Sequence, residues 1–175
     1  LSLHDALPIS ALMNSPGHRA NLMSALASHL GIGVAIGGEE GGRQELFIAQ
    51  VFTRVPPVLD AGAALAAITR KLTAARAGLL TDPALSAAAR RAATALAAGQ
   101  SSERAFAEVT SELGRTTTYQ RVGSVMKVLT DVDALDADSL VAGAVGKELG
   151  LGIAQGPHPE LGERAIWLVV LFGVR

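Results

Sequence analysis

Hydrophobic and polar positions near the start of the chain follow a helical period. In the stretch SPGHRANLM, residues 15–23, Ser15 is placed to cap a helix and Pro16 to occupy its first turn. Counting on by fours puts His18, Leu22 and Leu26 on one stripe. The pattern therefore predicts a short helix with a buried apolar side and a histidine at the edge of that side.

The pattern then changes to that of strands. LGIGVAIGG and LFIAQVFTR are two β-rich runs, and the polar, glycine-containing segment EEGGRQE lies between them. Such a pair of runs predicts a β-hairpin. The prolines of VPP, residues 55–57, end the second strand and predict a stiff linker, so a domain boundary is expected there.

Beyond the linker the pattern predicts four helices, of which three stop at Gly78, Gly99 and Gly114. These helices are expected at 60–77, 83–99, 102–113 and from Asp136 or Asp138 to 149. The run TTTYQRVGSVMKVL predicts one strand or two before the last helix, and two more strands finish the chain. The final strand, IWLVVLF, is apolar at every position, as expected of a strand covered on both faces.

The end of the chain repeats its beginning. LGIGVA, starting at Leu30, matches LGLGIA, starting at Leu149, at an offset of 119 residues (149 − 30). LFIAQVF, ending at Phe52, matches IWLVVLF, ending at Phe172, at an offset of 120 (172 − 52). Because a helix precedes the first strand in both places, a whole supersecondary unit recurs. We therefore predict two related domains, the first of them incomplete.

Composition and charge exclude several classes of protein. The 175 residues are 49% hydrophobic, which suffices for a buried core, and carry 15 basic against 16 acidic residues. With no basic stripe and 3% aromatic residues, nucleic-acid binding is not expected. The lack of cysteine excludes disulfides, thiol catalysis and thiolate metal sites. The apolar run at 165–174 is shorter than the about 20 residues of a transmembrane helix.

The first ten residues, LSLHDALPIS, do not begin with methionine and resemble the in-frame translation of a common sequencing-library adaptor. This resemblance predicts that residues 1–10 are an adaptor-derived artefact. In that case His4 and Asp5 carry no function, and any export signal would precede the break. The alternative is a natural amphipathic N-terminus, which no helical period supports.

His18 has two interpretations on spacing alone. One is a histidine at the edge of a core whose ring nitrogens meet backbone groups, and the other is a metal ligand or proton shuttle. Ser15 lies one turn before it, but a serine that caps a helix is not a free nucleophile, and no orienting acid is in view. The spacing favours the structural interpretation and leaves the other open.

Other polar groups are interpreted as structural. Asp131, Asp133, Asp136 and Asp138 alternate as calcium ligands do, but the run lacks the central glycine and closing glutamate of an EF-hand loop. We therefore interpret them as solvated turn and helix-cap residues. His158 lies between two prolines in the last hairpin loop and is expected to be solvated.

SPGHRANLM, HLGIGVA and FIAQVF together resemble the C-terminal half of a CAP domain. This superfamily comprises the cysteine-rich secretory, antigen 5 and plant pathogenesis-related proteins (the SCP domain), here in its cysteine-free bacterial form. The resemblance covers residues 12–54, where Leu12 replaces the usual tryptophan and residues 47–50 replace a Trp-Thr-Gln type strand. ITRKLTAARAGLLTDPALSAAARRAATALAAG is similar to the first helices of the same family.

The resemblance implies an α/β (α+β) fold, an α-β-α sandwich of CAP type. Residues 11–54 would be the C-terminal half of a truncated first CAP domain, 55–58 the proline-rich linker and 59–175 a degenerate CAP-like domain. In the second domain Ala92 stands where the family's helix bears a histidine, and the 119-residue offset places Ala137 opposite His18. The second copy is thus expected to keep the fold without the polar site, and no catalytic residue is predicted.

The family also implies export to the extracellular space or cell envelope, and a cleft where histidines and carboxylates converge. The cleft candidates of this chain are His18, Arg19 and Asn21. His18 is also the candidate ligand for a divalent cation of zinc type, in a site completed by the missing half.

The resemblance therefore predicts a non-enzymatic binding or scaffold module for a small apolar ligand, an envelope component or a protein. The truncated half-domain is expected to self-associate through the apolar surface that it exposes. The alternative is a metal-assisted hydrolase whose site lies in the first CAP domain.

Overall fold

The computed structural model describes residues 10, 12–25, 27–41 and 43–175. The chain divides into two compact units, Leu1–Val55 and Pro56–Arg175. Both contain helices and strands, so the α/β class expected from the sequence is confirmed. None of the described helices is long and apolar enough to span a membrane. Residues 1–9 of the predicted artefact, with His4 and Asp5, lie outside the described residues.

The first unit contains a helix and an antiparallel hairpin, as the sequence predicts. Its elements are α2 (Pro16–Leu22), β1 (His29–Glu40) and β2 (Arg43–Thr53). Gly41, in the turn between the strands, has a φ of 61°, which glycine adopts without steric penalty. The helix ends before Leu26, which lies outside the described residues, so the predicted stripe is too long.

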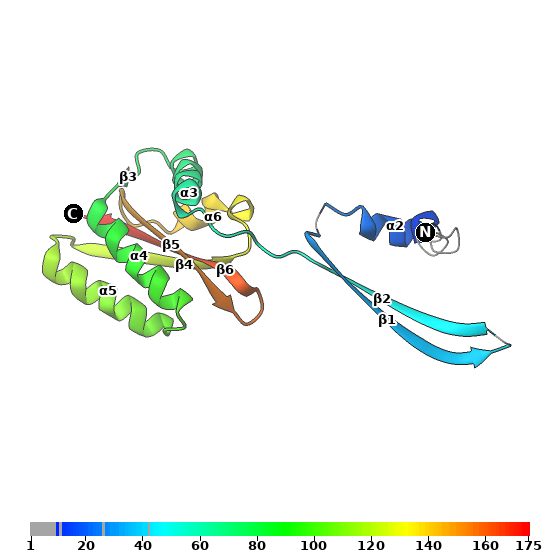
Figure 1. The fold of residues 1–175 in the computed structure, drawn as a ribbon. Helices are drawn as coiled ribbons and strands as arrows, with labels where there is room; N and C mark the ends of the chain where they lie inside the picture. The colour runs from blue at the N-terminus through cyan, green and yellow to red at the C-terminus, as the bar shows by residue number, and fades with distance from the viewer. Residues whose placement is uncertain (1–9, 11, 26, 42) are drawn as a thin grey trace. The chain divides into compact units, whose positions relative to one another are not determined.

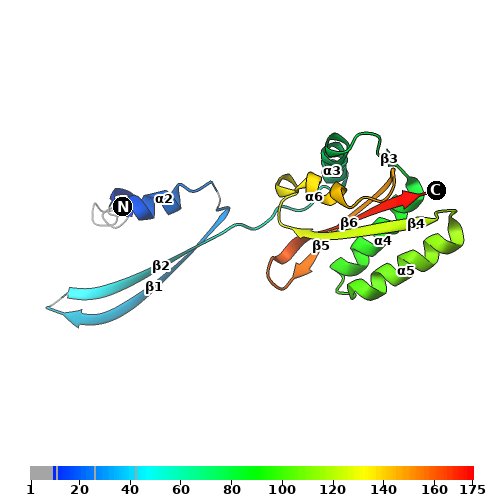
Figure 2. The same ribbon diagram turned by 180° about the vertical axis from the view of Figure 1, so that it is seen from behind.

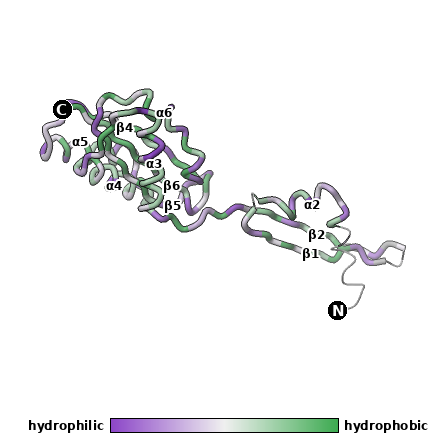
Figure 3. The backbone as a smooth tube through the Cα atoms, turned by 90° about the horizontal axis from the view of Figure 1, so that it is seen from above, coloured by the Kyte–Doolittle hydropathy of each residue, from purple (hydrophilic) through white to green (hydrophobic). Residues whose placement is uncertain are grey.

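Both faces of this hairpin are exposed within the first unit. The large apolar side chains that β1 and β2 expose retain between 45% and 68% of their accessible surface: Leu30, Ile32, Val34, Ile36, Leu46, Phe47, Ile48 and Val51. Figure 3 shows the hydrophobic stretches along the two strands. The expectation that this hairpin presents apolar surface is therefore met.

The second unit is built on a four-stranded sheet in the order β3-β5-β6-β4. The strands are β3 (Leu80–Thr81), β4 (Arg121–Leu129), β5 (Glu148–His158) and β6 (Gly162–Val174). β3 is parallel to β5, and the other neighbouring strands are antiparallel. The helices are α3 (Ala61–Ala75), α4 (Pro83–Ala97), α5 (Ser102–Thr116) and α6 (Ala137–Ala142), with a 3₁₀ turn, η1, at Val132–Ala134.

Each α-helix of this unit begins at a side chain that accepts a hydrogen bond from a first-turn amide. Asp60 accepts from Ala63, Asp82 from Leu85, Ser101 from Arg104 and Asp136 from Ser139. Each such cap contributes about 1 kcal/mol, because it satisfies an amide that the helix itself leaves free. Of the two aspartates predicted to cap α6, Asp136 does so.

Helices cover both faces of the sheet (Figures 1 and 2). One apolar cluster joins α3 and α6 to one face, and a second joins α4 and α5 to the other. Successive residues of β6 alternate between them: Leu168 and Val170 belong to the first cluster, Val169 and Leu171 to the second. β6 lies between β5 and β4, so the prediction that IWLVVLF is covered on both faces is confirmed.

The ends of α3 and α4 lie two residues before the predicted ones, and those of α5 and α6 differ by more. α5 continues past Gly114 to Thr116: a glycine inside a helix costs only about 1 kcal/mol, and the hydroxyls of Thr116 and Thr117 donate to the carbonyls of the last turn. α6 ends at Ala142 instead of residue 149, because Leu149 belongs to β5, where it pairs with Phe172. The β-rich run before α6 supplies one strand, β4.

The beginning of the second unit is tied to its last hairpin. The side-chain amide of Gln155 donates to the Pro57 carbonyl at 2.9 Å, and its oxygen accepts from the Leu59 amide at 3.0 Å. Arg164 donates to the Pro56 carbonyl at 3.2 Å. The proline-rich segment predicted as a stiff linker is therefore anchored to β5 and β6 over part of its length.

α4 lies directly on β5 because β5 lacks side chains along the line of contact. A Cβ atom built on Gly150, Gly152 or Gly156 would overlap the backbone of Leu85, Ala89 or Ala97, respectively. The helix contributes small residues to the same line, and Ala89 is fully buried. This close approach explains why glycines interrupt an otherwise apolar strand.

We predict that Gly152→Ala destabilises the second unit by about 3 kcal/mol, since the new methyl would force α4 away from the sheet. Gly114→Ala is the matched control, because nothing lies within 4 Å of its Cβ position and alanine favours the helix by up to about 1 kcal/mol. Urea unfolding followed through Trp167, the one tryptophan of the sequence, measures both changes in the free energy of unfolding. Equal effects of the two substitutions would contradict the close contact.

Candidate functional site

His18 lies on the first turns of α2, and its ring is exposed. Its Nδ1 is 2.9 Å from Ser15 Oγ. Ser15 has the extended backbone of an N-cap, but its side chain makes no capping bond, so its hydroxyl pairs with the histidine instead. No residue of α2 is buried, and the expectation of a core-edge histidine meeting backbone groups is therefore wrong for this unit.

Arg19 and Asn21 line different hollows. Arg19 borders an open hollow of about 550 Å³ together with Met13, Asn14, Pro16, Ala20 and Met23. Asn21 borders a smaller one of about 180 Å³ with Ser24, Ala27, Phe52, Thr53 and Arg54. His18 belongs to the lining of neither. In the part of the chain that the structure describes, the three predicted cleft residues thus share a helix, and Arg19 and Asn21 border different hollows.

A second serine–histidine pair stands where the hairpin begins. Ser28 Oγ is 2.9 Å from His29 Nδ1 and accepts a hydrogen bond from the Val55 amide at 2.9 Å. The backbone of Ser28 also donates to the Thr53 carbonyl at 3.0 Å. These contacts tie both ends of the hairpin together. Sequence analysis does not predict this pair, since an adjacent serine and histidine carry no periodic signal.

No metal centre is assembled in the part of the chain that the structure describes: no three or more histidine, aspartate or glutamate side chains lie close enough to hold an ion there. A tetrahedral zinc site needs at least three protein ligands. A zinc site completed by residues from elsewhere stays a prediction.

In the second unit, the two alanines that stand at family histidine positions lie in different apolar clusters. Ala92 on α4 is 2% exposed and packs in the cluster with α5. Ala137 opens α6 and packs against the cluster on the opposite face of the sheet. The two positions therefore contribute packing to two separate layers and bring no ionisable group to either.

His158 is less exposed than the sequence suggested. It is the last residue of β5 and half-buried, and its ring centroid lies 5.6 Å from that of Trp167. Its Nδ1 accepts a hydrogen bond from the Glu160 amide at 3.2 Å. The expectation of a loop position is wrong, because the strand continues through both residues that flank the first proline.

Of the four aspartates between residues 131 and 138, Asp131 and Asp136 act as caps. Asp131 accepts from the Asp133 amide at 2.9 Å, and Asp136 accepts from the Ser139 amide at 3.1 Å. Their carboxylates thus bind backbone amides of the following turns, as the cap interpretation predicts. The pattern that resembled calcium ligands follows from two successive helix starts.

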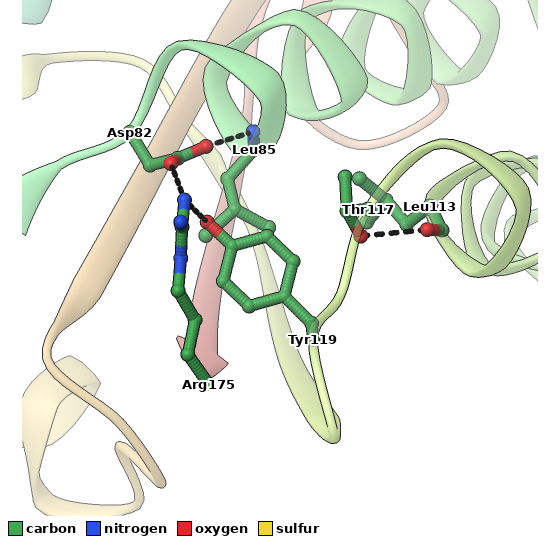
Figure 4. Close-up of polar contacts among 6 residues, drawn as sticks. All are labelled: Asp82, Leu85, Leu113, Thr117, Tyr119 and Arg175. Carbon is green, nitrogen blue, oxygen red and sulfur yellow. Dashed lines mark hydrogen bonds and ion pairs between the residues drawn. The ribbon is translucent and has the colours of Figure 1, made fainter.

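The best-organised polar group of the second unit joins Asp82, Tyr119 and Arg175 (Figure 4). Asp82 Oδ1 accepts from the Leu85 amide at 2.9 Å, and Oδ2 accepts from Arg175 Nη2 at 2.8 Å. The same nitrogen donates to the Tyr119 hydroxyl at 3.3 Å, and the guanidinium carbon lies 5.0 Å from the tyrosine ring centroid. The start of α4, the segment before β4 and the residue after β6 meet in this cluster.

Electrostatics assign this cluster a structural role. Burial raises the pKa of the Asp82 carboxyl, but hydrogen bonds from Leu85, Tyr119 and Arg175 outweigh it and hold the pKa below its ordinary value of 3.8. Burial is also the main reason that the pKa of Tyr119 lies above 10.0. A carboxylate held ionised and a phenol held protonated are poorly matched to proton transfer near neutral pH. The cluster clamps three segments together.

Sequence analysis places a helix at 83–99, and Asp82 directly precedes it. Arg175 lies 93 positions away from it, and no local pattern links the two. Thr117, whose hydroxyl donates to the Leu113 carbonyl at 2.6 Å, ends α5 and leads the chain to Tyr119 (Figure 4). The sequence feature that points to this cluster is Tyr119, the single tyrosine of the chain, which lies just after a helix and before a strand.

Comparisons with known proteins provide no relative: no family model, curated protein or solved structure matches this chain. The resemblance to the CAP superfamily therefore stays a prediction from the residues.

We predict that Asp82→Asn lowers the stability of the second unit by about 1 kcal/mol at pH 7, since asparagine can still cap α4 but loses the charge facing Arg175. Because the folded pKa lies below 3.8, the carboxylate contributes its full stability above that pH and loses it as pH falls through the folded value. The difference between variant and wild type should therefore shrink below about pH 4.

Urea titrations at pH 7 and pH 3 measure this change. Asp136→Asn is the matched control, because Asp136 caps α6 in the same way at an exposed position. If the difference in unfolding free energy between Asp82→Asn and wild type stayed constant with pH, the ionised form of Asp82 would not be what stabilises the unit.

We expect zinc to bind this chain with a Kd of about 1 µM or weaker, since one exposed histidine beside a serine cannot complete a tetrahedral site. Isothermal titration calorimetry of wild type and His18→Ala measures the affinity. Tight binding that disappears in the variant would overturn the expectation, and His29→Ala tests the other exposed serine–histidine pair.

Proposed function

We propose that this chain is part of an exported protein of CAP type and acts as a non-enzymatic binding or scaffold module. The observation that carries the proposal is the exposed apolar hairpin β1–β2, whose large side chains are between 45% and 68% exposed. Apolar surface of this extent is typical of a site that another molecule covers. A protein partner fits such a surface better than a small ligand does, because the hollows that Arg19 and Asn21 border are open to solvent.

The arrangement of the second unit supports a scaffold role. Its described carboxylates act mainly at helix starts or in ion pairs, as at Asp60, Asp82 and Asp136. Helices on both faces of the sheet agree with the sandwich that the family resemblance implies. Ala92 and Ala137 supply packing where acid–base or metal chemistry would need ionisable groups.

A metal-assisted hydrolase is the second candidate, and the exposure of His18 favours it. Metal-bound histidines usually fix their orientation through a hydrogen bond at the other ring nitrogen, and Nδ1 of His18 is so engaged by Ser15. The site would need ligands from a further element that covers the hairpin. Zinc-dependent hydrolysis by a longer form of the protein, lost in His18→Ala, would select this candidate.

We predict that the fragment Pro56–Arg175 folds by itself and lacks hydrolytic activity. The unit has its own two apolar clusters and holds Pro56 and Pro57 through Arg164 and Gln155. A single cooperative transition of Trp167 fluorescence in urea is expected, with no turnover of a chromogenic ester or an unfolded protein substrate. The full chain, assayed in parallel with and without zinc, is the control.

Activity of the fragment that is lost in His158→Ala would contradict the scaffold role, since His158 is the histidine of this unit. Absence of a cooperative transition would contradict its independence.

A further inference from the structure

The charged side chains of the second unit are divided between the two ends of its sheet. Glu160 and Glu163 lie at the β5–β6 turn, and Leu129, the last residue of β4, pairs with Ile166 close to that turn. The segment from β4 to the start of α6 follows directly and adds aspartates at positions 131, 133, 136 and 138. This end of the unit is therefore mainly acidic.

The opposite, basic end of the unit is where β6 finishes. Arg121 begins β4 and pairs with Val174, while Glu148, which directly follows Lys147, pairs with Gly173 from the other side of β6. Arg121 and Lys147 therefore flank the end of β6 on its two sides, and both are exposed. Neighbouring strands are about 4.8 Å apart, so these two cations stand about 10 Å from each other along the edge of the sheet.

A third cation, Arg76, is held at the same end. It follows the last residue of α3, and its Nη1 donates to the Ala144 carbonyl at 2.8 Å. Ala144 and Val145 lead from α6 to Lys147, and Val145 Cγ2 is 3.1 Å from a Cβ built on Gly123 of β4. The segment between α6 and β5 thus brings Arg76 beside the two cations that flank β6.

Among the residues that the structure describes, none of these three cations forms an ion pair. The carboxylates nearest to them have other partners or another direction. Asp82 binds Arg175, and Glu112 binds Arg91 at 2.6 Å. Glu148 lies on the side of β5 that α4 covers, since alternate residues of a strand point to the same face. The positive charge of this end is therefore left without a compensating carboxylate.

We propose that the basic end of the second unit, formed by Arg76, Arg121 and Lys147, binds a linear polymer of phosphate groups. Charge complementarity selects a polyanion, because the cations gather at one end and the acidic end repels the same ligand and so orients it. A polymer fits better than one phosphate, because the cations come from three segments and are spread along the sheet edge.

Nucleic acid fits this surface less well than a simple phosphate polymer does. Its bases would need aromatic side chains to stack on, and Tyr119, which lies at this end, already faces the guanidinium of Arg175. The inference goes beyond the proposed function, because it assigns a ligand to the second unit and uses no residue of the hairpin β1–β2.

The test uses the full chain, labelled with ¹⁵N, and linear tripolyphosphate as the probe. Titration should shift the amide signals of Arg121, Gly146 and Lys147 in a saturable manner. The signals of Asp136 and Gly162, at the acidic end, are the internal control and should not move. Orthophosphate should bind at least about tenfold more weakly, since one phosphate cannot reach all three cations.

Arg121→Gln and Lys147→Gln should each weaken tripolyphosphate binding about fivefold and lower the slope of log Kd against log salt concentration by about one. Both side chains are exposed, so the variants keep the fold, which their own spectra verify. Lys127→Gln is the matched control, because it removes the same charge from an exposed position of β4 about 20 Å from Arg121. It should leave the affinity unchanged.

Equal weakening by Lys127→Gln, shifts at both ends of the unit, or no saturable shift at millimolar tripolyphosphate would overturn the assignment. Tighter binding of a single-stranded DNA oligonucleotide of the same charge would overturn it in favour of nucleic acid. Binding to phosphatidylglycerol vesicles without binding to tripolyphosphate would overturn it in favour of a lipid surface. None of these measurements involves β1, β2 or hydrolysis, so their outcome is separate from that of the proposed function.

Discussion

The contact between α4 and the glycines of β5 is the constraint on which the second unit depends. Because the strand has glycines along this line, the backbone of α4 contacts the strand directly. This contact sets the distance between the helix layer and the sheet. α5 then packs on α4 and on the same face of the sheet. Asp82 fixes where α4 begins, because one carboxylate oxygen caps the helix and the other binds Arg175 after β6. The backbone contact between α4 and β5 and the hydrogen bonds of Asp82 together set the position of the helix along the strand.

The same constraint explains why the first unit is incomplete as a packed structure. Its strand β1 has small residues at alternate positions, Gly31, Gly33 and Ala35, as β5 does, but no residue of α2 is buried. A two-stranded hairpin by itself is marginally stable in water. The sequence of β1 and β2 is therefore suited to the middle of a layered structure, where one face meets a helix at short distance and the other meets larger side chains.

Local patterns predicted most elements of the fold. Asp60 and Asp136 mark helix starts, and the uninterrupted apolar run of β6 indicates a central strand. The errors arose where other contacts outweigh local preference: hydroxyl hydrogen bonds of Thr116 and Thr117 continue α5 past a glycine, and pairing of Leu149 with Phe172 shortens α6. The Asp82 clamp could not be predicted, because its partners come from distant segments. Periodicity also cannot show that His18 is exposed, since exposure depends on which element covers the helix.

Ionisable groups are used differently in the two units. In the second, Asp82 is locked in its charged form and His158 rests on Trp167, so these groups stabilise the fold. In the first, His18 and His29 are exposed, and each pairs with a serine. An exposed imidazole has too little fixed geometry for metal or acid–base chemistry until another element orders its surroundings. The element that covers the hairpin would therefore also decide whether these histidines acquire chemical partners, so binding comes before any chemistry in this unit.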